Sequence, residues 1–141
     1  MNPWSLANGV VWCAVVAACR SAGSQASVEE DRSQLLVGTW ASPNDVRKYK
    51  LEGNGSFTVT LDPRSCAGAS PFSTKMTASG KWKLQGAILA FTVDSASDAI
   101  LSGSTMNETL MTLEPNALVL DSSIVVCGSG GGTEKVQLHK Q

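Results

Sequence analysis

Side chains with reactive groups are few in this sequence, which has 141 residues, four Cys and one His. A Ser/His/Asp or Cys/His catalytic arrangement would have to use His139, which we expect to be exposed near the C-terminus. Asp62, Asp94 and Asp121 fall at the ends of predicted strands, where turn and capping roles account for them. We therefore predict no catalytic residues, no cofactor and no metal site, and we expect that the protein is not an enzyme.

The N-terminal part carries a processing signal. An apolar run from Val10 to Ala18 is shorter than the roughly 20 residues that a membrane-spanning helix needs. It ends in small residues, as secretory signals do. Val16-Ala17-Ala18-Cys19 resembles a bacterial lipobox, in which the Cys19 thiol is the lipid attachment site. We expect residues 1–18 to be a lipoprotein signal peptide; the alternative is an ordinary signal peptide that leaves Cys19 free.

The segment after this signal is predicted to be a tether. Residues 19–33 are rich in Ser, Ala, Gly, Glu and Asp, and they have too little apolar content to fold alone. By resemblance to enterobacterial lipoproteins, Arg20 beside the lipid-bearing Cys is compatible with sorting to the outer membrane. We therefore expect a cell-envelope protein that is held at the outer membrane by its N-terminal lipid and faces the periplasm or the cell surface.

Composition argues against nucleic acid as a partner and leaves one pair of Cys in the predicted domain. The net charge of −1 gives no electrostatic footprint for nucleic acid. Cys66 and Cys127 are the only Cys pair in the predicted domain, residues 34–141, and in an oxidising compartment they should bond. The alternative is two buried free thiols. Two isolated Cys lack the closely spaced partners that zinc requires.

Alternating apolar and polar residues indicate β-strands throughout residues 34–141. The clearest alternation is at residues 56–61, after the hairpin signal Gly53-Asn54-Gly55. The first strand is expected at 35–40, and residues 124–127 either prolong a late strand or begin another. About eight short strands without a convincing helix predict a small antiparallel up-and-down β-barrel, with a sandwich as the alternative. The side chains expected to line its interior are Tyr49, Phe57, Met76, Trp82 and Phe91.

The sequence Gly38-Thr39-Trp40 on the first expected strand resembles the Gly-x-Trp signature of lipocalins and their calycin relatives. The spacing onward to Phe57 is similar to that of short bacterial lipocalin-like domains, and so is Gly80-Lys81-Trp82 with the hairpin after it. The resemblance implies that Gly38 lets strands approach closely and that Trp40 packs across the closed end of the barrel. The chain lacks a recognisable C-terminal helix and a later Thr-Asp-Tyr-like motif.

The resemblance and the envelope signals together predict a non-catalytic binding protein. The expected partner is a small apolar ligand or another envelope component. The alternative is a periplasmic inhibitor of a protease or a lysozyme, acting through the barrel surface or the N-terminal segment.

Overall fold

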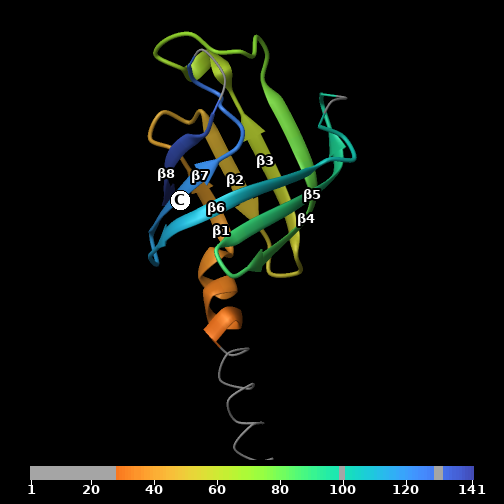
Figure 1. The fold of residues 1–141 in the computed structure, drawn as a ribbon, viewed down its shortest axis with the longest axis vertical. Coiled ribbons are helices and arrows are strands. Elements are labelled where there is room, and N and C mark those ends of the chain that lie inside the picture. Colours follow the sequence, from red (N-terminus) through yellow and green to blue (C-terminus); the bar gives the residue numbers. More distant parts are fainter. Residues whose placement is uncertain (1–27, 99–100, 129–131) are drawn as a thin grey trace, which may run out of the picture.

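The computed structural model describes residues 28–98, 101–128 and 132–141. A helix covers residues 28–36, and eight strands follow it (Figure 1). The strands are β1 (Gly38–Ala41), β2 (Arg47–Leu51), β3 (Ser56–Leu61), β4 (Met76–Gln85), β5 (Ile88–Ala96), β6 (Thr105–Leu113), β7 (Ala117–Ser122) and β8 (Glu134–Lys140). A single 3-10 turn, η1 (Pro63–Ser65), lies between β3 and β4.

The strands form a closed antiparallel barrel. Each strand pairs with the next along the chain, and β8 returns to pair with β1. This confirms the predicted fold class. It also shows which side chains face the barrel interior, because inward positions alternate with outward ones along each strand.

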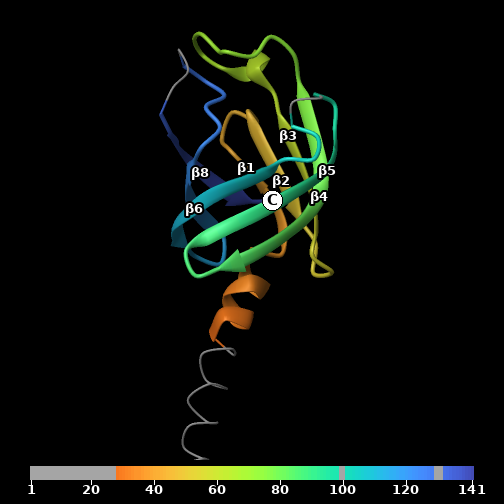
Figure 2. The same ribbon diagram turned by 45° about the vertical axis from the view of Figure 1, so that its right-hand side comes forward.

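The two ends of the barrel differ. The helix and the short β2–β3, β4–β5 and β6–β7 turns lie at one end, which we call the helix end (Figures 1 and 2). The β1–β2, β3–β4, β5–β6 and β7–β8 connections lie at the other end, which we call the mouth. The mouth therefore carries the longer loops, including residues 62–75.

The helix over residues 28–36 corrects two expectations. Residues 28–33 were expected to belong to the flexible linker, and residues 35–36 to the first strand. The helix is stabilised by docking on the barrel rather than by its composition. Arg32 donates a hydrogen bond to the Gly86 carbonyl oxygen (3.1 Å), and the Gly86 N–H donates to Glu29 (3.2 Å). Within the described chain, no helix is long and apolar enough to cross a membrane.

The Gly-x-Trp residues close the helix end. Trp40 is fully buried and donates from Nε1 to the Leu36 carbonyl oxygen (2.8 Å), while Leu36 is itself buried beneath the barrel. Gly38 has a φ of +138°, and a Cβ there would meet Cε of Lys140 at 2.6 Å. Lys140 lies over the Trp40 ring at 5.1 Å from its centroid. Trp40 is thus buried at the helix end, and Gly38 leaves room for the Lys140 side chain rather than for the backbone of a neighbouring strand.

A second glycine allows β4 and β5 to bend together. The β4–β5 register shifts between Ser79 and Gly80, and a Cβ at Gly80 would stand 1.9 Å from the Thr92 carbonyl oxygen. Only glycine fits such a close approach. The bulge curves both long strands, as closing a small barrel requires.

Candidate functional site

Charged and polar side chains meet inside the barrel just below the mouth. We call this group the mouth cluster: Arg47, Tyr49, Glu108, Ser122 and Glu134. Arg47 and Glu108 are only 2% and 1% exposed, and Tyr49 and Ser122 are also buried. Burying a charge costs free energy unless the charge is paired and hydrogen-bonded. The contacts of this cluster therefore decide whether the mouth is stable.

Arg47 is the centre of the mouth cluster. Its guanidinium donates to Tyr49 Oη (3.3 Å) and Ser122 Oγ (3.0 Å), and it forms a hydrogen-bonded ion pair with Glu134. Glu108 Oε1 lies 3.9 Å from the same guanidinium. The cation thus reaches strands β6, β7 and β8 from the start of β2.

Glu108 is held from the other side by two hydroxyl groups. Tyr49 Oη donates to Glu108 Oε1 (2.9 Å), and Ser122 Oγ donates to the same oxygen (2.9 Å). Each hydroxyl therefore accepts from Arg47 and donates to Glu108. This continuous network satisfies the buried polar groups, so the cluster ties four strands together at the mouth.

The pKa values of the two carboxyl groups in the cluster are shifted in opposite directions. Burial raises the pKa of Glu108, and the hydrogen bonds from Tyr49 and Ser122 and the charge of Arg47 offset this only in part. Partial burial alone would also raise the pKa of Glu134. Hydrogen bonds from the Val126 N–H and from Arg47 outweigh it and hold the pKa of Glu134 below its usual value.

This difference gives a test of the two roles. Glu134 contributes stability above the ordinary Glu pKa of about 4.3, and that contribution is lost as the pH falls through its lower folded-state pKa. Glu108 contributes in the opposite sense: its stabilisation is present below about pH 4.3 and is lost as the pH rises through its raised folded-state pKa.

We therefore expect opposite pH dependence from two matched variants in urea unfolding. The stability deficit of Glu134→Gln relative to the unmodified protein should shrink as the pH falls from 7 toward about 3. The stability of Glu108→Gln relative to the unmodified protein should instead increase as the pH rises from about 4 to 7. Parallel curves for the two variants would contradict the assignment.

Residues 123–128 cross the barrel opening; we call them the mouth strap. Arg47 donates to the Ile124 carbonyl oxygen, and the Val126 N–H donates to Glu134 Oε2 (3.0 Å). Val126 is fully buried and joins the hydrophobic core. The strap forms no strand. The expectation that 124–127 prolongs or begins a strand is therefore wrong, because these residues bond to cluster side chains instead of a neighbouring strand.

A disulfide fixes the strap to the long β3–β4 loop. Cys66 and Cys127 are bonded, with Cα atoms 5.5 Å apart, which resolves the two alternatives in favour of the disulfide. The Gly128 N–H also donates to the Ala69 carbonyl oxygen (2.7 Å), and Ser70 Oγ donates to the Val126 carbonyl oxygen. Covalent and hydrogen bonds together hold the strap across the mouth.

Replacing Cys66 and Cys127 together by Ala should lower the free energy of unfolding by about 2–4 kcal/mol, because the bond closes a long loop in the unfolded chain. The sequence separation of the bonded pair is 61 residues. Hydrogen exchange should accelerate most in the mouth strap, whereas the β4–β5 hairpin at the helix end serves as the internal control. Equal stability and equal strap exchange would contradict this role.

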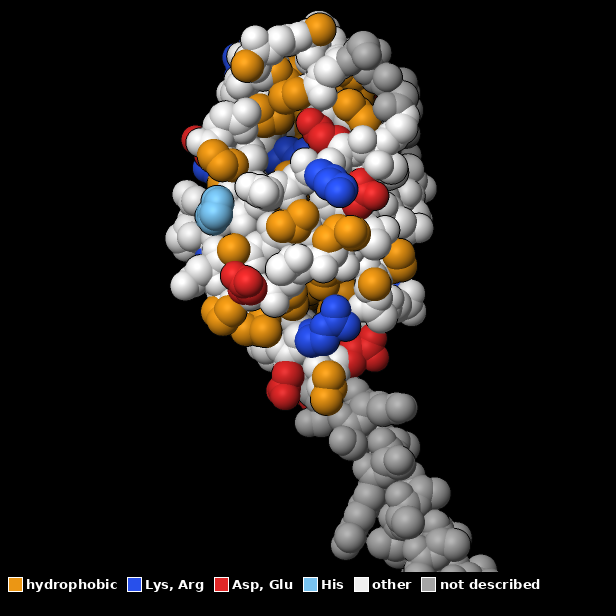
Figure 3. Space-filling model, turned by 60° about the vertical axis from the view of Figure 1, so that its left-hand side comes forward, with side chains coloured by type: hydrophobic (Ala, Val, Ile, Leu, Met, Phe, Trp, Pro, Cys, Tyr) orange, Lys and Arg blue, Asp and Glu red, His pale blue; other side chains and the backbone are white. Residues whose placement is uncertain are grey.

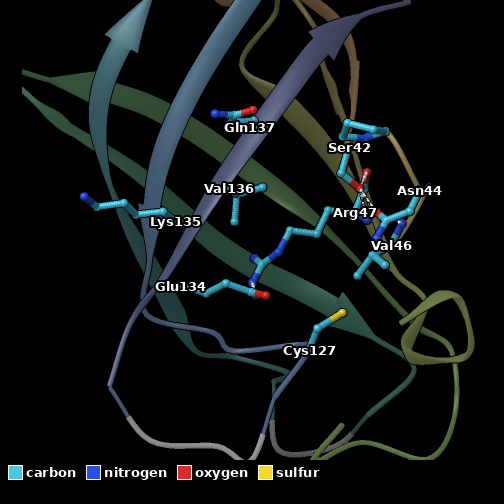
Figure 4. Close-up of a pocket in the computed structure, with 10 residues that line it drawn as sticks. Ser42, Asn44, Val46, Arg47, Cys127, Glu134, Lys135, Val136 and Gln137 are labelled. Carbon is cyan, nitrogen blue, oxygen red and sulfur yellow. Dashed lines mark hydrogen bonds and ion pairs between the residues drawn. The ribbon is translucent and has the colours of Figure 1, made fainter. Parts of the chain in front are cut away.

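A pocket of about 320 Å³ opens beside the mouth cluster, at the seam between β1–β2 and β8. Figure 3 brings the β8 side forward and shows a hollow with acidic and basic side chains near the mouth. Figure 4 shows Arg47 and Glu134 pointing toward each other across the seam, with Cys127 nearby. The pocket is lined by Ser42, Pro43, Asn44, Val46, Arg47, Cys127, Glu134, Lys135, Val136 and Gln137.

The structure separates the predicted interior residues from this pocket. All five are buried, and none of them lines it. Their rings pack on one another: Phe91 lies 4.8 Å from Phe57 and 5.8 Å from Tyr49 between ring centroids. Tyr49 alone joins the mouth cluster, while Met76 and Trp82 belong to the hydrophobic core. Cys19 lies outside the described residues.

The charged members of the cluster were not predicted, although their positions on alternating strands mark two of them. Arg47 shares its face of β2 with the buried Tyr49. Glu108 shares its face of β6 with the buried Met106 and Leu110. A charge at an inward position of an alternating strand is the available signal. No sequence pattern pairs Arg47 with Glu108, because their strands are not neighbours.

The buried carboxyl of the mouth cluster and the pocket beside it are separate. The Glu108 carboxyl is enclosed, accepts hydrogen bonds from protein donors and does not line the pocket, whereas Arg47, Glu134 and Lys135 do. Across the described ranges, no group of three or more His, Cys, Asp or Glu side chains is placed to hold a metal ion.

A closed eight-stranded antiparallel barrel with Trp40 buried at one end is consistent with a lipocalin-like fold. No known family model matches the chain, and a comparison with curated proteins finds no match either.

Proposed function

We propose that this protein is a lipid-anchored, non-catalytic binding protein of the bacterial cell envelope, built on a lipocalin-like barrel. Cys19 carries the lipid, and the seam pocket takes a small apolar ligand or a segment of another envelope component. The observation that carries the proposal is the pocket of about 320 Å³ between the β1–β2 turn and β8. Its volume lies at the lower end of the range for ligand sites.

The position and lining of the pocket support this function. Val46 and Val136 are buried and give it an apolar floor, while Glu134, Lys135 and Gln137 give it polar walls. Such a mixture of apolar surface with a few polar groups is typical of binding sites. The pocket also lies at the mouth, away from the helix end, where the described chain begins.

Native mass spectrometry tests the binding function. We would use the full chain with Cys19→Ser, purified from a periplasmic fraction without detergent. The expected spectrum shows an added mass that is lost on denaturation. Pro43→Trp should reduce this added mass because the indole fills the pocket, whereas Pro71→Trp, outside the pocket, should retain it. A bare polypeptide mass, or equal retention in both variants, would contradict binding of a small apolar ligand in this pocket.

Lipid attachment is tested separately. Cys19→Ser should release the protein from the membrane fraction of a bacterial host, because lipid attachment is through this thiol. The unmodified protein should remain in the membrane fraction, and its mass should include a diacylglyceryl group. Equal membrane association of both proteins would show that the lipobox assignment is wrong while leaving the pocket unaffected.

A further inference from the structure

Strand β1 is too short to pair with the whole length of β8. The two strands pair only at Trp40↔Lys140 and Ala41↔His139. Continuing this register would place Pro43 opposite Gln137, but proline has no N–H to donate to a ladder. The chain turns into the β1–β2 connection instead, where the Asp45 N–H donates to the Ser42 carbonyl oxygen (3.0 Å).

The turn leaves the first part of β8 without a neighbour at the seam. The Gln141 N–H donates to Thr39 on β1, whereas the Lys140 N–H donates to Asn116 on the opposite side. Because backbone groups alternate along a strand, those of Lys135 and Gln137 point toward β1's side, into the seam. The described residues give these two N–H groups and two carbonyl groups no main-chain partner at the seam.

We propose that the seam binds an extended peptide segment of another envelope protein. The segment adds to β8 as a short strand, in the position that β1 would take if it continued beside β8. The inference rests on the proposed function, since it names the partner of the same pocket. Backbone hydrogen bonds to an open sheet edge supply affinity in this mode of recognition, and side-chain pockets supply specificity. The pocket borders residues 134–137 of β8, so it follows the open edge itself.

The side chains around the seam specify the peptide. Lys135 is exposed on the outer face of β8, so an acidic side chain directly opposite would form a favourable cross-strand pair. The inward side chains of the peptide would meet Val46 and Val136, which favour an apolar residue. The expected segment therefore alternates acidic residues outward with apolar residues inward.

The probe is the acetylated and amidated pentapeptide Glu-Val-Glu-Val-Glu, titrated into the ¹⁵N-labelled full chain with Cys19→Ser. Amide signals of residues 134–138, of Ser42 and of residues 44–47 should shift. In the expected register the Glu N–H groups face β8 and the Val N–H groups face away. N-methylation of the central Glu should weaken binding about tenfold, whereas N-methylation of a Val should not.

Protein variants provide the matching tests. Gln137→Pro removes one N–H from the open edge and should weaken binding about tenfold, whereas Gln137→Ala keeps the N–H and should bind normally. Lys135→Glu should disfavour the acidic probe and favour Lys-Val-Lys-Val-Lys. The methylated peptides keep the proposal testable if Gln137→Pro does not fold.

Shifts confined to other surfaces, equal loss with either methylated peptide, or no binding would overturn strand addition. The mass measurement distinguishes this failure from failure of the proposed function. A retained small molecule that Pro43→Trp displaces, together with no peptide binding, overturns strand addition alone. A bare mass with no peptide binding overturns both.

Discussion

Replacing Trp40 by Ala should lower the free energy of unfolding by about 3–5 kcal/mol, as expected for loss of a large buried aromatic side chain. Trp40 is 0% exposed, and its indole N–H anchors the last turn of the helix through the Leu36 carbonyl oxygen. The substitution therefore opens a cavity at the helix end and also detaches the helix. Urea unfolding followed by circular dichroism measures the loss.

Trp40→Phe is the matched control because it retains an aromatic ring but not the N–H. We expect it to lose about 1–2 kcal/mol, from one hydrogen bond and slightly poorer packing. Hydrogen exchange over residues 28–36 should rise in both variants. An unchanged unfolding curve for Trp40→Ala would show that the Gly-x-Trp motif does not close the barrel.

Replacing Arg47 by Met should cost about 3–5 kcal/mol at neutral pH, because it leaves buried carboxylate charge without its partner. Met fills much of the same space, so the loss reports on charge more than on volume. Glu108, at 1% exposure, is the group most affected, while Glu134 is 23% exposed and reaches solvent. The strap also loses its bond to Ile124.

The pH dependence of this variant separates electrostatics from packing. Without Arg47 the pKa of Glu108 should rise further, so Arg47→Met should recover stability as the pH falls and Glu108 takes up a proton. Adding Glu108→Gln should restore part of the loss at neutral pH. A loss that is constant with pH and unaffected by Glu108→Gln would contradict the cluster as described.

The sequence predicts the barrel well because its signals are local. Alternation within each strand and glycine-rich turns between strands determine which residues face inward, and β3 and its hairpin were placed from those signals alone. The same argument extends to Trp40, whose position in β1 makes it inward-facing. The disulfide was predictable because Cys66 has only one possible partner in the domain.

The helix and the candidate site could not be predicted from local sequence patterns, because both depend on contacts between residues that are distant in the sequence. The helix is held by Gly86, more than fifty positions from Arg32 and Glu29. Arg47 meets Glu108 only because the barrel closes. The seam likewise depends on where β8 returns to β1, although Pro43 marks the point at which β1 must end.

Both ends of the described chain lie on one side of the barrel. The helix leads into β1 there, and the Gln141 N–H donates to Thr39 at the start of β1. A fluorescent protein or affinity tag fused after Gln141 therefore attaches opposite the mouth. Immobilising the protein through such a fusion leaves the seam free, so a sensor surface coated in this way should present every molecule with its β8 edge outward.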